Sequence, residues 1–286
     1  MDNIYDHNEF FQAYAEMGRS KGGLAAAGEW RQLQPLFPDL HEKRVLDLGC
    51  GYGWHCKYAV QMGASEVLGI DSSKKMIERA MIENPDERIQ YEVCGVEEYS
   101  YPENTYDLVV SNLVLHYIKD LDCIYQKVYR TLTAGGCFLF NIEHPTFTAG
   151  VNEDWIYDEN KRPRYWAIDN YYYPGERETR FLGQRVMKQH HTLTQILNPL
   201  LKNGFQIEAV EEAMPSADMI NTPEMRDEMR RPMMLLVKAA KDHVQSCGQL
   251  DRIHIDETGK NDCNHRLTRN RKDNSICCRC KGIVYG

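Results

Sequence analysis

The chain of 286 residues is long for one domain and short for two large ones, and its 42% hydrophobic residues suffice for a sizeable core. A formal net charge of −8 argues against non-specific nucleic-acid binding by the whole surface. Residues 251–286 hold eight Lys/Arg and five Asp/Glu, so this tail carries +3 and residues 1–250 carry −11.

The N-terminal sequence is polar and shows no signal peptide, and no apolar run approaches the length of a membrane span. The cysteines before the tail region lie in predicted core elements or loops of an intracellular type of domain: Cys50, Cys56, Cys94, Cys123 and Cys137. We therefore expect these thiols to be reduced and the protein to be cytoplasmic.

The first 40 residues are predicted to be largely helical, with ordinary packing of the helices and a solvated loop as the simplest arrangement. Residues 6–17 have apolar or aromatic side chains at helical spacing, namely Phe10, Phe11, Tyr14 and Met17. The basic, glycine-rich stretch 18–23 predicts a flexible hinge, and a second helix is expected over about 24–34.

Residues 45–71 organise the remainder of the chain. The apolar run 45–48 fits a buried parallel strand, which ends at Gly49, Gly51 and Gly53. Glycine permits a tight turn and a close approach of a ligand, and the helix expected over 54–62 would offer unpaired N–H groups there. The next apolar run ends in Asp71, whose carboxylate can accept two ribose hydroxyl hydrogen bonds.

The glycine spacing separates two kinds of nucleotide cofactor. A dinucleotide site requires G-x-G-x-x-G, whereas Trp54 stands where the last glycine of that pattern belongs. Asp47, near the end of the first strand, offers a carboxylate to a cationic ligand instead.

Helical and extended patterns alternate beyond this stretch. Ser72 is a suitable N-cap for the next helix, and residues 120–131 have the apolar face of a crossover helix. Strands are expected over 89–94, 108–111 and 137–142. The alternation predicts a parallel, doubly wound sheet with ligands at the carboxyl ends of its strands. The polar residues at such ends are Asp47, Asp71, Asn112 and Glu143.

Residues 144–191 interrupt this alternation with many aromatic residues and five arginines. We predict an insertion that covers the substrate and has short strands of its own; the alternative is a satellite core with a solvated basic rim. A helix over 192–202, despite Pro199, and strands over 205–210 and 233–239 are expected to complete the fold.

The tail from residue 241 is polar and contains a C-x-H and a C-x-x-C pair. Cys263, His265, Cys277 and Cys280 could hold one tetrahedral Zn²⁺, which would supply the folding energy that so short a segment lacks. The alternative is a disordered tail with incidental thiols.

Four stretches resemble class I S-adenosylmethionine (SAM) methyltransferases. The run V-L-D-L-G-C-G-Y-G at 45–53 is similar to motif I, 106–112 and 115–118 resemble motif IV and the segment after it, and 132–136 resembles the turn before strand five. The group that the chain resembles is the type 11 methyltransferases, similar to enzymes of quinone biosynthesis. Because of this resemblance we expect an α/β, Rossmann-like, doubly wound sheet of seven strands in the order 3-2-1-4-5-7-6, with the last strand antiparallel.

The same resemblance implies a methyltransferase domain over 1–240, which includes the cap 1–40 and the insertion 144–191, followed by the tail 241–286. Its implied cofactor is SAM. The predicted cofactor contacts are Asp47, Gly49, Gly51, Gly53, Asp71, Ser72, Val96, Glu97 and Asn112, with Tyr14 and Arg19 from the cap.

We predict transfer of the SAM methyl group to an O, N or C nucleophile of a small molecule, with His190, His144 and His116 as candidate bases. The aromatic insertion favours a flat or apolar acceptor. Two alternatives stay open: an RNA or protein methyltransferase that docks through the basic Cys/His tail, and a SAM-binding regulator without catalysis.

Overall fold

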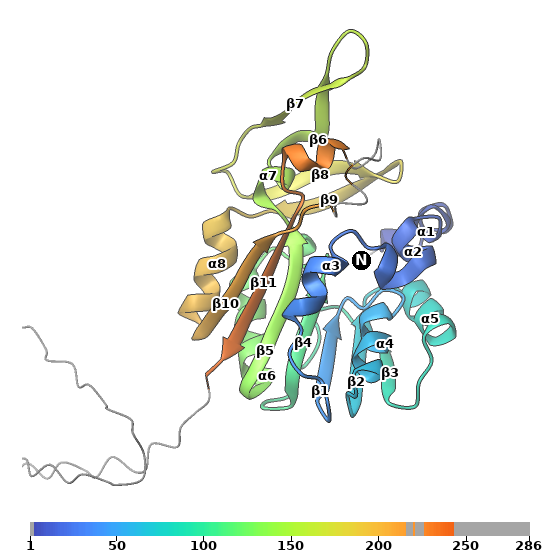
Figure 1. The fold of residues 1–286 in the computed structure, drawn as a ribbon, viewed down its shortest axis with the longest axis vertical. Coiled ribbons are helices and arrows are strands. Elements are labelled where there is room, and N and C mark those ends of the chain that lie inside the picture. Colours follow the sequence, from blue (N-terminus) through green and yellow to red (C-terminus); the bar gives the residue numbers. More distant parts are fainter. Residues whose placement is uncertain (1–2, 216–219, 221–225, 243–286) are drawn as a thin grey trace, which may run out of the picture. The chain divides into compact units, whose positions relative to one another are not determined.

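The computed structural model describes residues 3–215, 220 and 226–242, and Figure 1 follows the chain through them. Met1–Gln245 forms one compact unit, and Ser246–Gly286 falls outside the described residues.

A seven-stranded sheet forms the centre of this unit, in the order β10-β11-β5-β4-β1-β2-β3. The five strands from β5 to β3 are parallel, and β11 runs antiparallel to both of its neighbours. This topology confirms the predicted order. The strand bounds are β1 (Arg44–Leu48), β2 (Glu66–Asp71), β3 (Ile89–Val93), β4 (Tyr106–Asn112), β5 (Leu132–Glu143), β10 (Phe205–Glu212) and β11 (Met234–Lys241).

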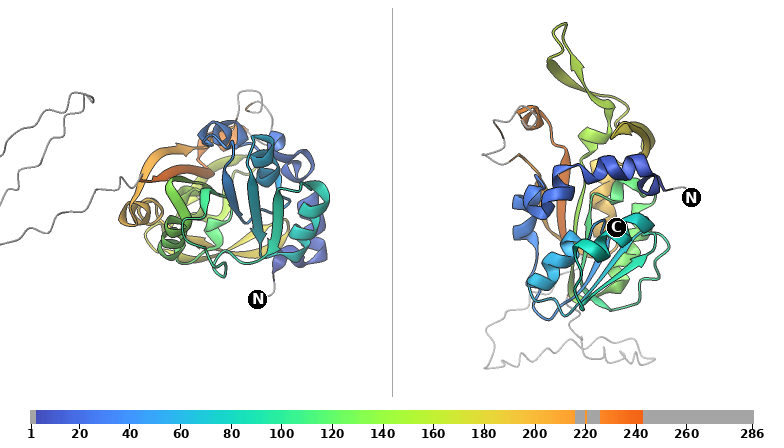
Figure 2. Two further views of the ribbon diagram at one scale, coloured as in Figure 1. Left: turned by 90° about the horizontal axis from the view of Figure 1, so that it is seen from below. Right: turned by 90° about the vertical axis from the view of Figure 1, so that its right-hand side faces the viewer.

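Helices cover both faces of the sheet (Figure 2). They are α4 (Trp54–Gln61), α5 (Lys74–Glu83), α6 (Leu121–Thr131) and α8 (Leu193–Lys202). Successive side chains of β1 enter two different cores: Leu46 and Leu48 pack in the cluster that holds residues of α6 and α8, whereas Val45 packs with residues of α4. Burial on both faces explains why β1 is apolar without alternation.

Polar side chains begin these helices close to where the sequence predicted. The hydroxyl of Ser73 accepts the Met76 N–H (3.2 Å) and caps α5, so the predicted cap at Ser72 is wrong by one residue. Asp120 caps α6, and Thr192 forms a capping box that starts α8.

The N-terminal residues form short helices: η1 (Ile4–Asp6), α1 (Asn8–Ala15), α2 (Gly18–Gly22), η2 (Gly23–Ala26), α3 (Trp30–Leu33) and η3 (Gln34–Leu36). The first of the two predicted helices, over 6–17, is confirmed by α1 with shorter bounds. The predicted hinge over 18–23 is wrong, because residues 18–22 are helical, and the predicted helix over 24–34 is divided. The chain turns at Gly23, which has φ +60° and lies against the ring of Trp54. A Cβ at this position would come within 2.9 Å of the indole.

The insertion contains the short strands that its composition predicted. After α7 (Pro145–Thr148), β6 (Gly150–Tyr157) pairs with β7 (Pro163–Ile168), and β8 (Gly175–Phe181) pairs with β9 (Gln184–His190). Both pairs lie beyond the carboxyl ends of β4 and β5 (Figure 1). A 3-10 helix, η5 (Asp227–Arg230), packs beside them.

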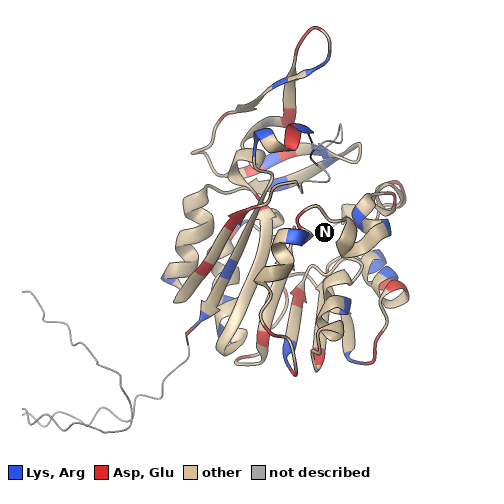
Figure 3. Ribbon diagram, viewed as in Figure 1, with Lys and Arg blue, Asp and Glu red and all other residues tan. Residues whose placement is uncertain are grey.

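Lys and Arg are interspersed with Asp and Glu along the described elements (Figure 3). Within the described part of the chain, no helix has the length and apolar character needed to cross a membrane.

Candidate active site

The three glycines after β1 all have positive φ, but their surroundings differ. A Cβ at Gly49 would collide with Val114, and one at Gly53 would collide with the Tyr91 hydroxyl. A Cβ at Gly51 would meet nothing within 4 Å. Gly51 (φ +53°) is therefore the glycine beside which the loop leaves room for a ligand, whereas the other two admit close packing of the protein itself.

Asp71 ends β2 beside this loop. Its Oδ2 accepts the Gly51 N–H (3.0 Å), and its Oδ1 accepts the Ser73 N–H (2.8 Å). Burial raises the pKa of the carboxyl to about 6, even though these two amides stabilise the ionised form. Each oxygen keeps a further lone pair with which a ribose hydroxyl could bond.

Asp47 lies inside the sheet with its carboxylate toward α4. It is 1% exposed, its Oδ2 accepts the Cys56 thiol (3.3 Å), and its Oδ1 has no hydrogen-bond partner. Burial raises its pKa to about 7. The structure thus places Asp47 below the loop surface, where its charge rather than a solvent-facing oxygen would act on a cationic ligand.

The N-terminal segment is bonded to the loop that follows β2. The Asn3 amide donates to the Ser72 hydroxyl (3.0 Å). One oxygen of Asp6 accepts both the Ser73 hydroxyl (2.7 Å) and the Lys75 N–H (3.1 Å). These contacts hold η1 over the carboxyl end of β2.

Aromatic rings from the N-terminal segment gather above the glycine loop. Tyr14 contacts Tyr5 and Tyr52 edge-on, with ring centroids 5.6 and 5.8 Å apart. The hydroxyls of Tyr5 and Tyr117 are hydrogen-bonded (3.1 Å), which joins η1 to the segment after β4. Burial raises the pKa of Tyr14, and nearby Arg19 lowers it, so the predicted cap residues Tyr14 and Arg19 lie near each other.

Arg19 pairs with Glu29, a residue that the sequence reasoning missed. Its Nη2 lies 3.1 and 2.8 Å from the two Glu29 oxygens, and Glu29 is 2% exposed. Glu29 also accepts the Asn112 amide (3.3 Å), and Asn112 accepts the Asn141 amide (2.8 Å). This chain of contacts ties α2 to the ends of β4 and β5. No sequence signal marked Glu29, because a single glutamate outside a motif reads as a solvated side chain.

The remaining predicted cofactor contacts lie on the loop after β3. The side chain of Val96 is buried and its carbonyl accepts the Tyr101 hydroxyl (2.8 Å). Glu97 has an exposed side chain, and its carbonyl accepts the Lys127 ammonium (2.8 Å).

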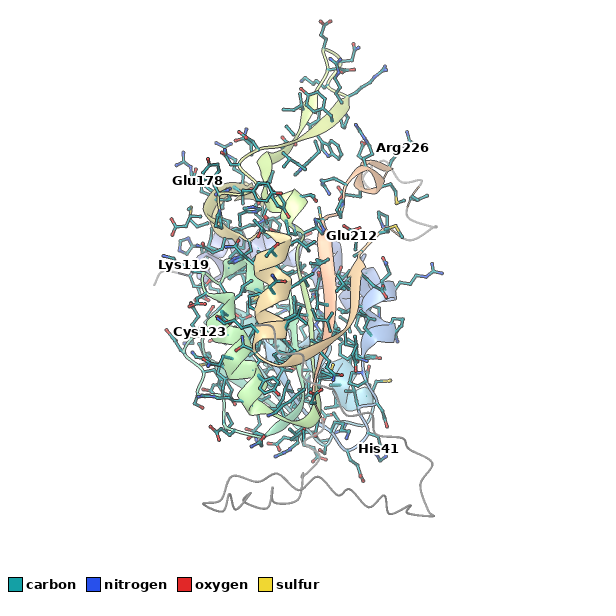
Figure 4. The ribbon with its side chains drawn as sticks, turned by 90° about the vertical axis from the view of Figure 1, so that its left-hand side faces the viewer. His41, Lys119, Cys123, Glu178, Glu212 and Arg226 are labelled. Carbon is teal, nitrogen blue, oxygen red and sulfur yellow. The ribbon has the colours of Figure 1, made fainter. Side chains whose placement is uncertain are left out.

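The three candidate bases have different surroundings. Both ring nitrogens of His190 are hydrogen-bonded, Nδ1 to the Thr148 hydroxyl (2.7 Å) and Nε2 to the Tyr171 carbonyl (2.9 Å). His144 caps α7 through Nδ1, and its Nε2 lies 3.0 Å from Glu212, the last residue of β10 (Figure 4).

His116 is buried, and its Nδ1 has no hydrogen-bond partner. Its Nε2 lies 3.8 Å from Glu143. Burial lowers its pKa well below the usual value, so the ring is neutral and one of its nitrogens is a lone-pair base. Of the three predicted histidines, His116 is the one whose ring still has an unused nitrogen.

No group of three or more His, Cys, Asp or Glu within residues 3–215, 220 and 226–242 is arranged to hold a metal ion. The predicted zinc ligands Cys263, His265, Cys277 and Cys280 lie outside the described residues.

A glycine loop open beside Gly51 and a carboxylate at the tip of the adjacent strand define a Rossmann-like site for a nucleoside cofactor. Comparisons with known proteins specify the cofactor. The crystal structure of a putative SAM-dependent methyltransferase from Listeria monocytogenes is 46% identical, covers 77% of this chain and 99% of its own, and has a TM-score of 0.74. That of a SAM-dependent methyltransferase from Mesorhizobium loti is 41% identical, covers 77% and 100%, and has a TM-score of 0.71.

The family model described as a methyltransferase domain, type 11, matches residues 46–140. An uncharacterized protein of Haemophilus influenzae is 29% identical over 253 residues, which are 84% of this chain and 97% of that protein. The chain thus belongs to the type 11 family of class I SAM-dependent methyltransferases, and it is an enzyme of that kind.

Proposed function

We propose that this enzyme transfers the methyl group to a small-molecule acceptor that it holds between the N-terminal helices and the insertion. The observation that supports this proposal is the closure of the site. The N-terminal segment is bonded to the end of β2, and Phe10 of α1 contacts Phe181 of β8 with ring centroids 5.8 Å apart. Such closure suits a small acceptor, because a polymer needs an open surface.

The residues present fit SAM. Gly51 leaves room on the loop, Asp71 keeps lone pairs for the ribose hydroxyls, and Asp47 adds negative charge beneath a cationic ligand. We propose that Arg19 and Tyr14 close the methionine end of this site. When bound, SAM supplies a methyl group that is already activated on its sulfonium, so the protein mainly aligns the acceptor and excludes water.

His116 is the proposed base if the acceptor is a hydroxyl or an acidic carbon, which must lose a proton. The ring is neutral, buried and close to Tyr117, whose hydroxyl contacts Tyr5 above the glycine loop. His190 and His144 use their ring nitrogens in contacts within the protein, which favours structural roles for both.

Incubation of the enzyme with methyl-labelled SAM and, separately, a metabolite extract or total tRNA and protein tests the acceptor class. We expect label in the small-molecule fraction, and equal labelling by the full chain with Cys277→Ser and Cys280→Ser. Label that appears only in tRNA or protein, and that requires the two cysteines, would show instead an enzyme that docks through its tail.

A further inference from the structure

Four ionisable side chains from different elements meet under the insertion. Lys188 of β9 lies 2.7 Å from Glu143 at the end of β5 and 3.0 Å from Glu153 of β6. His116 of η4 (Leu115–Tyr117) lies 3.8 Å from the same Glu143 oxygen. We call Glu143, Glu153, Lys188 and His116 the carboxylate cluster. Their side chains are only 4–13% exposed.

The cluster has more acceptor atoms than the protein uses. Glu143 Oε2, Glu153 Oε1 and His116 Nδ1 are buried and have no hydrogen-bond partner. Native proteins satisfy most buried polar atoms, since each one left unpaired destabilises the fold. Three such atoms in one place indicate a site for a ligand that carries hydrogen-bond donors.

Charge in the cluster is also unbalanced. Burial raises the pKa of both carboxyls, while the two carboxylates together outweigh burial and raise the pKa of Lys188. One ammonium faces two carboxylates, and His116 is neutral, so full ionisation leaves one negative charge without a partner. A buried charge of this kind is costly unless a cation pairs with it.

The cluster lies next to the predicted methyl donor site. Tyr117 adjoins His116, with ring centroids 4.4 Å apart, and its hydroxyl bonds to Tyr5. Burial raises the pKa of Tyr5, and both Asp71 and Glu143 raise it further. The Tyr5 hydroxyl therefore lies within electrostatic reach of Asp71, the proposed ribose ligand, and of Glu143 in the cluster. The Tyr5–Tyr117 pair thus lies near both Asp71, at the ribose end of the site, and Glu143 of the cluster.

A cavity between the two strand pairs of the insertion borders the cluster. It has a volume of about 250 Å³, and its lining includes Glu153, Thr148, Asn152 and Arg177. Glu153 therefore borders both the cavity and the cluster, which offers a route for an acceptor that does not cross the N-terminal segment.

We propose that the carboxylate cluster binds the acceptor as an amine and that Glu143 takes its proton before methyl transfer; this rests on the proposed small-molecule function. The acceptor enters as an ammonium, which supplies the missing positive charge. Glu143 accepts one proton, and the freed nitrogen lone pair forms the N–C bond as the C–S bond breaks. The C–S electron pair stays on sulfur, and the proton on Glu143 later passes to solvent. Glu153 and Lys188 position Glu143.

Paired probes with one carbon skeleton test this inference: 2-phenylethylamine against 2-phenylethanol, and cyclohexylamine against cyclohexanol. Calorimetry with the S-adenosylhomocysteine-loaded enzyme measures binding, and mass spectrometry after incubation with SAM measures transfer. In at least one of the two pairs, we expect the amine to bind more tightly than the alcohol and to be methylated in preference to it. Glu143→Gln should weaken amine binding and transfer at least about tenfold and leave S-adenosylhomocysteine affinity unchanged.

Glu208→Gln is the matched control. Glu208 is exposed on β10 and pairs with Lys238 of β11, so this variant should leave all these values unchanged. Preference for the alcohols, binding of neither member of any pair, or wild-type behaviour of Glu143→Gln would overturn the inference. Absence of S-adenosylhomocysteine binding by the wild type would count against the proposed function instead.

The melting temperature separates this role from a structural one. Glu143→Gln removes the unpaired charge, and its amide oxygen can still accept from Lys188, so the free enzyme should melt at the wild-type temperature or above. A structural ion pair would instead make the variant less stable. Glu153→Gln removes the same excess charge. It should likewise weaken amine binding and transfer without lowering the melting temperature, which keeps the test decisive if Glu143→Gln folds poorly.

Discussion

Protonation of Asp71 should control the affinity for the cofactor. The ionised carboxylate is the form that accepts ribose hydroxyls with charge assistance, and its pKa without ligand is raised to about 6 by burial. Above that pH the site can bind the ribose hydroxyls through the ionised carboxylate, and below it the carboxylate is protonated and this charged acceptor is lost. At pH 5 about one tenth of the molecules would be ionised, so the apparent Kd for S-adenosylhomocysteine should be about tenfold weaker than at pH 7.5.

Calorimetry between pH 5 and 7.5 at constant ionic strength measures this effect. The midpoint should fall near the pKa of Asp71, not near the higher value of about 7 at Asp47. Asp71→Asn should bind weakly at every pH and show no such step. Asp86→Asn is the control: hydrogen bonds from Arg88 hold the Asp86 pKa at about 2, so this variant should keep the wild-type step. The reasoning fails if wild-type affinity is constant over this range or if Asp71→Asn retains the step.

Three further predictions concern the glycine loop and its cover. The folded pKa of Asp47, about 7, exceeds the unfolded 3.8. Between these values the unfolded carboxyl ionises while the folded one stays protonated, so stability is lost over this range and the loss is complete above about pH 7. Denaturant unfolding at about pH 8.5 should therefore show Asp47→Asn more stable by up to ~4 kcal/mol, with no gain near pH 4. Tyr5→Phe leaves the Tyr117 hydroxyl without its partner and should lower the free energy of unfolding by about 1–3 kcal/mol. Adding Tyr117→Phe to the same chain should largely restore that free energy, and an equal loss in the double variant would contradict this. Gly51→Ala should reduce the affinity for S-adenosylhomocysteine. Gly183 also has positive φ and open space at its Cβ, so Gly183→Ala should lose only about 1–2 kcal/mol of stability through backbone strain and should bind S-adenosylhomocysteine with wild-type affinity.

The acceptor side of the site shows why side-chain roles were harder to foresee than the fold. His190 stood out in the sequence as the histidine before a helix, but both of its ring nitrogens are bonded within the protein. Lys188, two residues earlier on the same strand, faces the carboxylates. Residues two apart on a strand share a face, so the strand pattern does not distinguish them, and only the packing of the two strand pairs decides what each side chain meets.

The sequence by itself determined the parallel sheet and the meeting of the glycine turn at Gly51 with Asp71, because these depend on local patterns: an apolar strand, a glycine turn, and an acidic residue at the next strand end. The strand order followed from the resemblance to class I methyltransferases. Tertiary structure alone brought Glu29 to Asn112, and Glu143 to Glu153 and Lys188. The physical reason is separation along the chain. These partners are 10 to 83 residues apart, so no period or spacing records their contact, and burial, which sets their pKa values and charge balance, exists only once the elements have packed.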